Sequence, residues 1–366
     1  MASINLYDKV QINLIGNSNS IINLKKYFSY FEGESESPDF KIDIKPIESL
    51  PKIEKNLGST FAVAGEYVVI KENQRSPILL NRDLNEILIS PDTSHTYLSK
   101  FIEYPLRKSL IKDDLAMIHA ASVKIKGETL CFPAWRNTGK TNTLLSLLKK
   151  DAKLISDDRV WIDSKGNIMA YPLAIHMGEY NYEAFPELKD NNYLRKKQKQ
   201  LGKKIKNVCS ENGNLQEKGF FKKALWFTSD FYLDTSHKKI YSLKDLPINL
   251  NVEYSSKIDK VILLQSNVDI EPNEMEKTPA KPKNILKAIE AINEYEWNNS
   301  IRTYIKVIDY FFPNKNLQDE FSIIEKRENE IFSNMLETIN LFELNLPEKS
   351  FWAQNNSKML IYEAIK

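Results

Sequence analysis

The stretch that most constrains the fold of this chain is residues 131–145, which read CFPAWRNTGKTNTLL. Its first residues are apolar and suit a buried strand, and from Gly139 onward it opens a leucine-rich helix. Between them, Ala134 to Thr141 match the pattern Gly-x-x-x-x-Gly-Lys-Ser/Thr except at the first glycine. A strand, a turn of backbone N–H groups and a helix N-terminus together form a phosphate site. We therefore predict a phosphate-binding loop in an α/β domain.

The pattern predicts roles for several residues of this loop. Lys140 would contact the β- and γ-phosphates and Thr141 a Mg²⁺ ion. Ala134 is tolerated at a negative φ and strained at a positive one, where glycine is the default. Trp135 and Arg136 either contact nucleotide or substrate or pack against the protein, and an ordinary strand-turn-helix junction is the alternative to the whole site. The predicted nucleotide-binding residues are Ala134, Trp135, Arg136, Asn137, Thr138, Gly139, Lys140, Thr141 and Asn142.

Two adjacent carboxylates follow the next predicted strand, AKLIS, at Asp157 and Asp158. Successive side chains of an extended chain point to opposite sides, so one carboxylate can face a metal ion while the other faces a substrate. The second would be able to accept the proton of a hydroxyl group. A solvated turn or a helix cap is the alternative interpretation of the pair.

His119 follows the apolar residues LAMI and begins the segment HAAS, one strand before the loop. There it would lie beside the strand that leads into Ala134. By itself a lone histidine is more often a core or surface group than a catalytic one. Its spacing from the other motifs makes it a candidate.

The segments IHAAS, PAWRNTGKT and LISDDRV, in this order, resemble the HPr kinase/phosphorylase-like family, which is related to the nucleotide domain of phosphoenolpyruvate carboxykinase. His119 precedes Lys140 by 21 residues and Asp157 follows it by 17, as in that family. The resemblance covers about residues 115–177. It implies an α/β fold with an HPr kinase-like P-loop nucleotide domain, and the cofactors ATP and Mg²⁺. The implied activity is phosphoryl transfer to a serine-like hydroxyl of a small molecule, peptide or protein.

The resemblance also implies roles for the carboxylates. Asp157 aligns with the first aspartate of the family and is favoured as the general base, with His119 beside the base. Asp158 would then hold the metal with Thr141 and Glu179, although the reverse assignment of the two aspartates stays open. Two alternatives to a kinase remain. One is an ATP- or GTP-binding regulatory protein with a degenerate loop and little transfer. The other is a nucleotide-using enzyme of another type, or a nucleic-acid-associated NTPase that acts through the basic insertion.

The rest of the chain predicts three regions. Residues 1–112 read as an α+β module, residues 113–282 as the nucleotide domain with a polar, basic insertion near 179–257, and residues 283–366 as a helical region. Within these regions we expect strands near 10–15, 60–71, 86–90 and 257–265, helices near 18–31 and 93–112, a long helix at 317–343, and hairpins that turn at Gly127 and near Gly166.

Composition excludes several classes. A net charge of +2 does not favour nucleic acid as a partner. The basic runs at 194–206 and 218–223 are interpreted as a solvated insertion, with a nucleic-acid surface or a lid over an anionic substrate as the alternatives. The chain has no apolar run long enough for a membrane span and its N-terminus is unlike a secretory signal, so we expect a cytoplasmic protein. Cys131 and Cys209 are too few for a disulfide framework. A homo-oligomer is compatible with the sequence but is not indicated by it.

Overall fold

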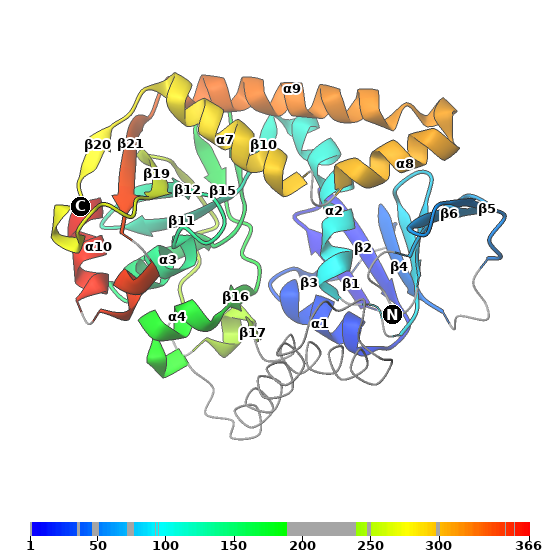
Figure 1. Cartoon of the computed structure of the whole chain (residues 1–366), viewed down its shortest axis with the longest axis horizontal. Coiled ribbons are helices and arrows are strands. Elements are labelled where there is room, and N and C mark those ends of the chain that lie inside the picture. Colours follow the sequence, from blue (N-terminus) through cyan, green and yellow to red (C-terminus); the bar gives the residue numbers. More distant parts are fainter. Residues whose placement is uncertain are drawn as a thin grey trace, which may run out of the picture.

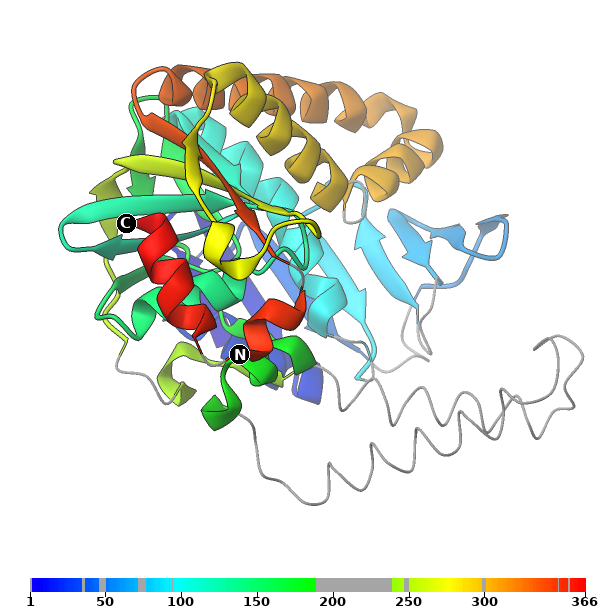
Figure 2. The same cartoon turned by 60° about the vertical axis from the view of Figure 1, so that its left-hand side comes forward.

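The structure is a computed structural model with a mixed α/β fold. One sheet forms the N-terminal part, a second sheet carries the predicted loop, and long helices from the C-terminal part run across both (Figure 1). Figure 2 shows the same helices from the side, above the two sheets. The residues that the structure describes are 2–34, 37–45, 51–71, 77–91, 93, 95–188, 239–246, 250–297, 301–347, 349–354 and 356–366.

The N-terminal sheet is built from short strands with buried apolar residues. Among the described residues its strand order is β3-β1-β2-β4-β9-β8-β7-β6-β5. Helices α1 (Asn19–Tyr27) and α2 (His95–Leu110) belong to this part of the chain. The strands are β1 Ala2–Leu6, β2 Val10–Ile15, β3 Glu32–Gly33, β4 Phe40–Ile44, β5 Lys55–Leu57, β6 Phe61–Ala64, β7 Tyr67–Ile70, β8 Ile78–Asn81 and β9 Glu86–Ile89.

The sheet that carries the loop has the order β13-β11-β12-β19-β21-β20, and a smaller sheet, β10-β14-β15-β18, lies beside it. Strands β16 and β17 form a separate pair. The strands are β10 Leu115–Ile118, β11 Ala120–Ile125, β12 Glu128–Pro133, β13 Lys153–Ser156, β14 Val160–Asp163, β15 Asn167–Met169, β16 Ile175–Met177, β17 Lys239–Tyr241, β18 Ser255–Lys257, β19 Lys260–Ser266, β20 Lys277–Pro279 and β21 Asn340–Leu346. The helices are α3 Lys140–Leu148, α4 Glu179–Ala184, α7 Pro282–Trp297, α8 Thr303–Phe311, α9 Leu317–Leu336 and α10 Ser357–Ile365.

Strand direction brings the predicted site together at one edge of this sheet. β11 runs antiparallel to both of its neighbours, with Ala120 opposite Pro133 of β12 and Ser122 opposite Ser156 of β13. The start of β11 therefore lies beside the ends of β12 and β13. His119, the loop and the aspartate pair come from these three strand ends.

The long helix predicted at 317–343 is wrong at its C-terminal end. Helix α9 ends at Leu336, and residues 340–346 form strand β21, which pairs in parallel with β19 along its whole length. No glycine or proline separates the two elements in the sequence. Burial of Leu341, Leu344 and Leu346 in the sheet outweighs local helix propensity here.

The remaining predicted elements are found, with shifted ends. The run at 60–71 is a hairpin of β6 and β7 that turns at Gly65, whose φ is 59°. The hairpins at Gly127 and Gly166 are confirmed, as are the strand that becomes β19 and the helices that become α1 and α2. The basic runs at 194–206 and 218–223, and Cys209, lie outside the described residues.

One apolar cluster joins the N-terminal sheet to the rest of the molecule. It contains residues of β1, β2, β4 and β9 together with Trp161 of β14, Trp297 of α7 and Phe321 of α9. Helix α2 is thus held between the N-terminal sheet and the long helices. Cys131 is buried as a free thiol in β12. In the part of the chain that the structure describes, no helix is both long and apolar enough to cross a membrane.

Candidate functional site

The predicted loop connects β12 to α3. Ala134 is fully buried, forms a parallel bridge with Leu264 of β19, and is not among the residues with a positive φ. Alanine at this position is therefore unstrained. Asn137, in the turn, takes a left-handed φ of 63°, which asparagine tolerates better than most residues. Thr138 is buried and its N–H donates to the carbonyl of Trp135.

Gly139 caps helix α3 and could not be replaced by a larger residue. Its φ is 111°, and a Cβ there would lie 2.7 Å from the indole ring of Trp352. Trp352 belongs to a short 3-10 helix, Lys349–Ala353, near the C-terminus. The first bond inside α3 runs from the Thr143 N–H to the Gly139 carbonyl at 2.8 Å. The N–H groups before Thr143 have no acceptor inside the helix and can bind an anion.

Lys140 is buried and points at His119. Its Nζ lies 2.6 Å from Nε2 of His119, and the lysine residue is 8% exposed. An ammonium group can only donate, so Nε2 accepts and the ring proton is on Nδ1. Burial, and next the charge of Lys140, hold the pKa of His119 well below its ordinary value. His119 is therefore a neutral acceptor for the lysine at pH 7.

Asp157 lies beside Thr141. The threonine hydroxyl donates to Oδ2 of Asp157 at 3.2 Å. The other oxygen, Oδ1, is buried and has no hydrogen-bond partner among the described residues. Burial raises the pKa of Asp157 to about 7. A buried carboxylate oxygen without a donor, next to a threonine hydroxyl, is a suitable ligand pair for a divalent cation.

Asp158 lies on the other side, among cationic groups. Its Oδ1 is 3.5 Å from Nδ1 of His119 and 3.6 Å from Nζ of Lys140, while Oδ2 accepts from Arg159. Burial acts to raise the pKa of Asp158, but Arg159, His119 and Lys140 together lower it well below its ordinary value. The side chain is 38% exposed, so this ionised carboxylate is accessible to a substrate.

Two glutamates from other parts of the chain form ion pairs with the arginines of the site. Glu103 of α2 pairs with Arg159 at 2.6 Å, and Glu296 of α7 binds the guanidinium of Arg136 through both oxygens. Nothing in the local sequence around Glu103 or Glu296 marks either of them as part of a site. Both were missed by sequence reasoning because they come from helices that pack onto the sheet from distant positions.

Trp135 and Arg136 extend from the loop toward the end of α7. Trp135 is 41% exposed, and its ring meets that of Tyr295 edge to face, with centroids 5.8 Å apart. The guanidinium of Arg136 lies 5.9 Å from the centre of the same tyrosine ring. The two residues thus contact the protein, as one of the two sequence interpretations holds, and Trp135 also retains an exposed surface.

The remaining predicted residues lie further from the aspartates. The side-chain carbonyl oxygen of Asn142 accepts from Nδ2 of Asn181 at 2.7 Å, so this side chain ties α3 to α4. Glu179 is the first residue of α4, and its side chain lies outside the described part of the structure. Within the described residues, no group of three or more His, Cys, Asp or Glu side chains is placed to hold a metal ion alone. Mg²⁺ bound with a nucleotide needs only one or two carboxylates, because phosphates and water supply the other ligands.

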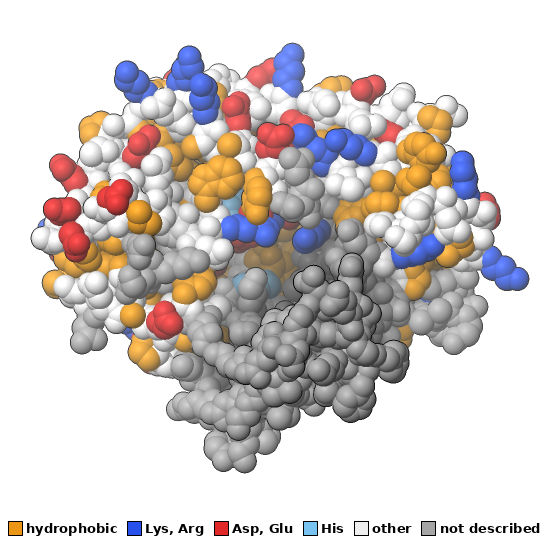
Figure 3. Space-filling model, in the orientation of Figure 1, with side chains coloured by type: hydrophobic (Ala, Val, Ile, Leu, Met, Phe, Trp, Pro, Cys, Tyr) orange, Lys and Arg blue, Asp and Glu red, His pale blue; other side chains and the backbone are white. Residues whose placement is uncertain are grey.

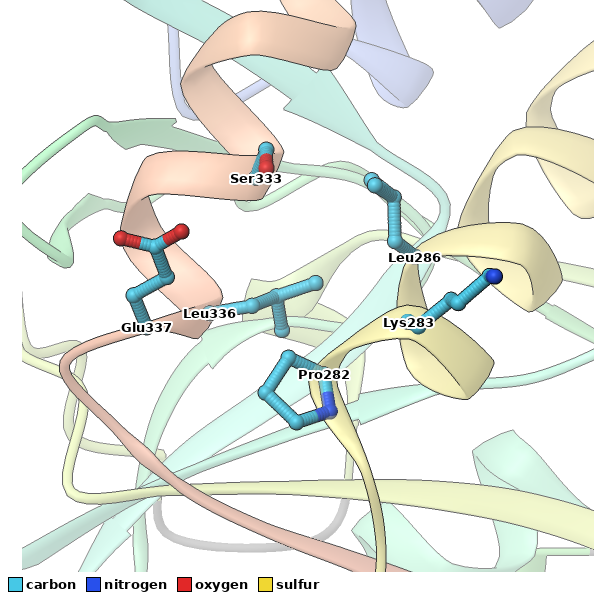
Figure 4. Close-up of a pocket in the computed structure, with 6 residues that line it drawn as sticks. All are labelled: Pro282, Lys283, Leu286, Ser333, Leu336 and Glu337. Atoms are coloured by element: carbon cyan, nitrogen blue, oxygen red, sulfur yellow. The ribbon is translucent and has the colours of Figure 1, made fainter.

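The surface near this edge is hollowed. In Figure 3, Lys, Arg and His side chains lie near the middle of the face, between the part that contains α2 and the part that contains α3. A separate groove of about 330 Å³ lies between α7 and α9, far along the chain from the loop (Figure 4). It is lined by Pro282, Lys283, Leu286, Ser333, Leu336 and Glu337, and the only charged groups in that lining are one lysine and one glutamate. The chemistry of the loop, and not the size of this groove, identifies the candidate site.

Comparison with known proteins adds little to these observations. No model of a protein family matches the chain. No curated protein matches its sequence. The solved structure of the Hpr(Ser) kinase/phosphatase from Coxiella burnetii is similar over 68% of this chain and 93% of that chain, with 9% identity and a TM-score of 0.26. A likeness of this degree is too weak to assign a family.

Proposed function

We propose that this protein is an ATP-dependent kinase, with an HPr kinase-like P-loop fold, that transfers a phosphoryl group to a hydroxyl of a small molecule, peptide or protein. One observation carries the proposal: Lys140, His119 and Asp158 converge at one sheet edge, with Thr141 and Asp157 paired beside them. A lysine and helix N-terminus for phosphates, a hydroxyl–carboxylate pair for metal and a second, accessible carboxylate are the groups that phosphoryl transfer requires.

The Asp157 side would hold the metal. Thr141 and Asp157 lie at hydrogen-bonding distance, and Oδ1 of Asp157 lacks a donor among the described residues, so the residues present fit a Mg²⁺ ion. When bound, Mg²⁺ neutralises charge on the β- and γ-phosphates. Glu179 remains a predicted further ligand from the start of α4.

Asp158 would be the general base. His119 was expected beside the base, and it lies beside Asp158, so the geometry favours the reverse of the assignment preferred from the sequence. Asp158 is ionised and accessible, and it can accept the proton of the acceptor hydroxyl while the hydroxyl oxygen bonds to the γ-phosphorus and ADP leaves. Its basicity is weak because of Arg159. A loose transition state tolerates this, since the proton can move late.

Lys140 would change partners when the nucleotide binds. In this structure its ammonium is bound by His119, and phosphate oxygens would compete for the same donors. His119 would then keep Nδ1 toward Asp158 and hold that carboxylate in place. The predicted loop residues contribute chiefly through their backbone N–H groups.

A second function is favoured by one feature. Trp352 lies against Gly139, and His119 accepts from Lys140. A protein that binds ATP or GTP for regulation, and transfers little, would also suit a loop whose lysine must exchange His119 for a phosphate.

The experiment that separates the two functions uses γ-labelled ATP with Mg²⁺ and a panel of hydroxyl acceptors, including serine peptides and small alcohols. Label transferred to an acceptor, and lost in Asp158→Asn, supports the kinase. Tight ATP binding by calorimetry without transfer to any acceptor supports the regulatory protein. Absence of ATP binding would overturn the loop assignment itself.

A further inference from the structure

Helix α2 reaches the candidate site through one ion-pair chain. Arg159 donates from Nη1 to Oδ2 of Asp158 and from Nη2 to Oε1 of Glu103, the latter at 2.6 Å. The side chains of Arg159 and Glu103 are 14% and 10% exposed. The arginine is thus held between two carboxylates, one from the site and one from the N-terminal part of the chain.

The division of donors on Arg159 decides what Asp158 can do. An arginine next to a single carboxylate tends to form a fork, with two parallel N–H bonds to both oxygens. Here the second nitrogen is taken by Glu103, so Oδ1 of Asp158 is left facing His119 and Lys140 without a hydrogen bond shorter than 3.5 Å. A forked Asp158 would have both oxygens occupied and would accept a proton poorly.

We propose that Glu103 is a positioning residue of the kinase site: it holds Arg159 away from a forked contact and thereby keeps Oδ1 of Asp158 open to the acceptor hydroxyl. The proposal rests on the proposed function. It makes helix α2 a part of the catalytic arrangement and not only a support for the N-terminal sheet. Oε2 of Glu103 is buried without a hydrogen-bond partner among the described residues, which is costly for a carboxylate placed for stability alone.

The same helix carries a natural control. Arg107 of α2 binds both oxygens of Glu328 on α9, and its guanidinium lies 3.3 Å from the ring centre of Trp297. This second pair is a fork and is fully buried. None of the interactions described above links it to Asp157 or Asp158. Loss of Glu328 should therefore affect folding stability much more than the rate of transfer by folded protein, which it can reach only through the charge that Arg107 exerts on Glu103.

The test compares steady-state transfer by wild type, Glu103→Ala, Glu103→Gln, Arg159→Gln, the double variant Glu103→Ala/Arg159→Gln, and Glu328→Ala. In Glu103→Ala, kcat should fall by about tenfold or more, as for one displaced charge-assisted contact, with the KM for ATP within about twofold. Glu103→Gln keeps an acceptor for Arg159 and should recover part of the rate. Glu328→Ala should lower the melting temperature with kcat within about twofold.

The double variant shows whether Glu103 acts through Arg159. Without the arginine no fork can form, so removal of Glu103 should not slow Arg159→Gln further. Multiplied losses in the double variant, or an unchanged kcat in Glu103→Ala, would overturn the positioning role.

A crystal structure of Glu103→Ala gives a readout that needs no acceptor. Arg159 should turn and donate to both oxygens of Asp158, and an arginine that stays in place would refute the proposal. If Arg159 turns but wild type transfers no phosphate to any acceptor, the ion-pair geometry stands and the kinase assignment, with the catalytic meaning of Glu103, is rejected.

Discussion

Two neighbouring carboxylates of one chain segment lie in opposite environments. Asp157 points inward, accepts from Thr141, and keeps one buried oxygen without a donor among the described residues. The side chain of Asp158 is 38% exposed and faces Arg159, His119 and Lys140. Identical side chains one residue apart thus acquire different chemistry because the bend that follows β13 turns them toward different neighbours. The Asp157 side suits a cation, and the Asp158 side suits the transfer of a proton.

The largest expected effect is on the rate of phosphoryl transfer when Asp158 is changed. Asp158→Asn keeps the shape of the side chain and removes the proton acceptor, so transfer should fall by about 10²- to 10⁴-fold, the range for loss of a general base. The Kd for Mg·ATP should change by no more than about threefold, because the metal ligands are intact. Transfer is measured with labelled ATP and binding by calorimetry. If Asp158→Asn, and not Asp157→Asn, loses the requirement for Mg²⁺, then Asp158 is the metal ligand and Asp157 the general base.

The next effect concerns Lys140, which contacts His119 and lies near Asp158, and which would contact the phosphates of a nucleotide. Lys140→Ala removes a charge-assisted contact of about 1.5–3 kcal/mol, so ATP affinity should fall by more than about tenfold. Desolvation opposes the charge of the buried Lys140 and lowers its pKa, so loss of this ammonium should not unfold the protein. Circular dichroism of the variant checks folding. Unchanged ATP affinity in a folded variant would contradict the loop assignment.

The Asp157 side can be tested without any nucleotide, through the pH dependence of stability. Burial raises the pKa of Asp157 from 3.8 to about 7, so the folded state prefers the protonated acid. The stabilisation is complete below the unfolded pKa and is lost as pH rises toward 7. The amide side chain of the Asp157→Asn variant cannot ionise. The free energy of unfolding of this variant, relative to wild type, should therefore rise between pH 4 and pH 7 by at least about 1 kcal/mol.

Urea unfolding in the absence of Mg²⁺ measures this difference. If the free energies of unfolding of wild type and Asp157→Asn change in parallel from pH 4 to pH 8, the carboxyl group of Asp157 is not buried as described. Added Mg²⁺ at pH 7.5 should stabilise wild type more than the variant, since only the carboxylate binds the ion well.

The sequence was informative where spacing is local. The strand, loop and helix around Lys140, the hairpins at Gly127 and Gly166, and the position of His119 beside the loop all follow from residues close together in the chain, and the structure places them together. Which aspartate faces which partner was not predictable, because the sequence does not show the direction of a side chain at a strand end.

Contacts made over long sequence distances were also missed. Glu103, Glu296 and Trp352 reach the site from α2, α7 and a segment near the C-terminus, and only tertiary packing brings them there. The sequence predicts helix where β21 forms for the same reason: the pairing of β21 with β19 depends on a partner about 80 residues away. Assignment of the chain to regions 1–112, 113–282 and 283–366 stays a prediction.

The smallest expected effect concerns Ala134, the first residue of the loop, where the sequence has alanine in place of the usual glycine. Because Ala134 is not among the residues with a positive φ and is buried in the bridge to Leu264, its methyl group is accommodated and glycine has no strain to relieve. Ala134→Gly should therefore change ATP affinity by no more than about threefold and lower stability by about 0.5–1 kcal/mol, through added freedom of the unfolded chain. Calorimetry and urea unfolding measure the two quantities. A gain in affinity above about tenfold, or 1.4 kcal/mol, would mean that the alanine impairs the loop, and would favour the regulatory nucleotide-binding protein over the kinase.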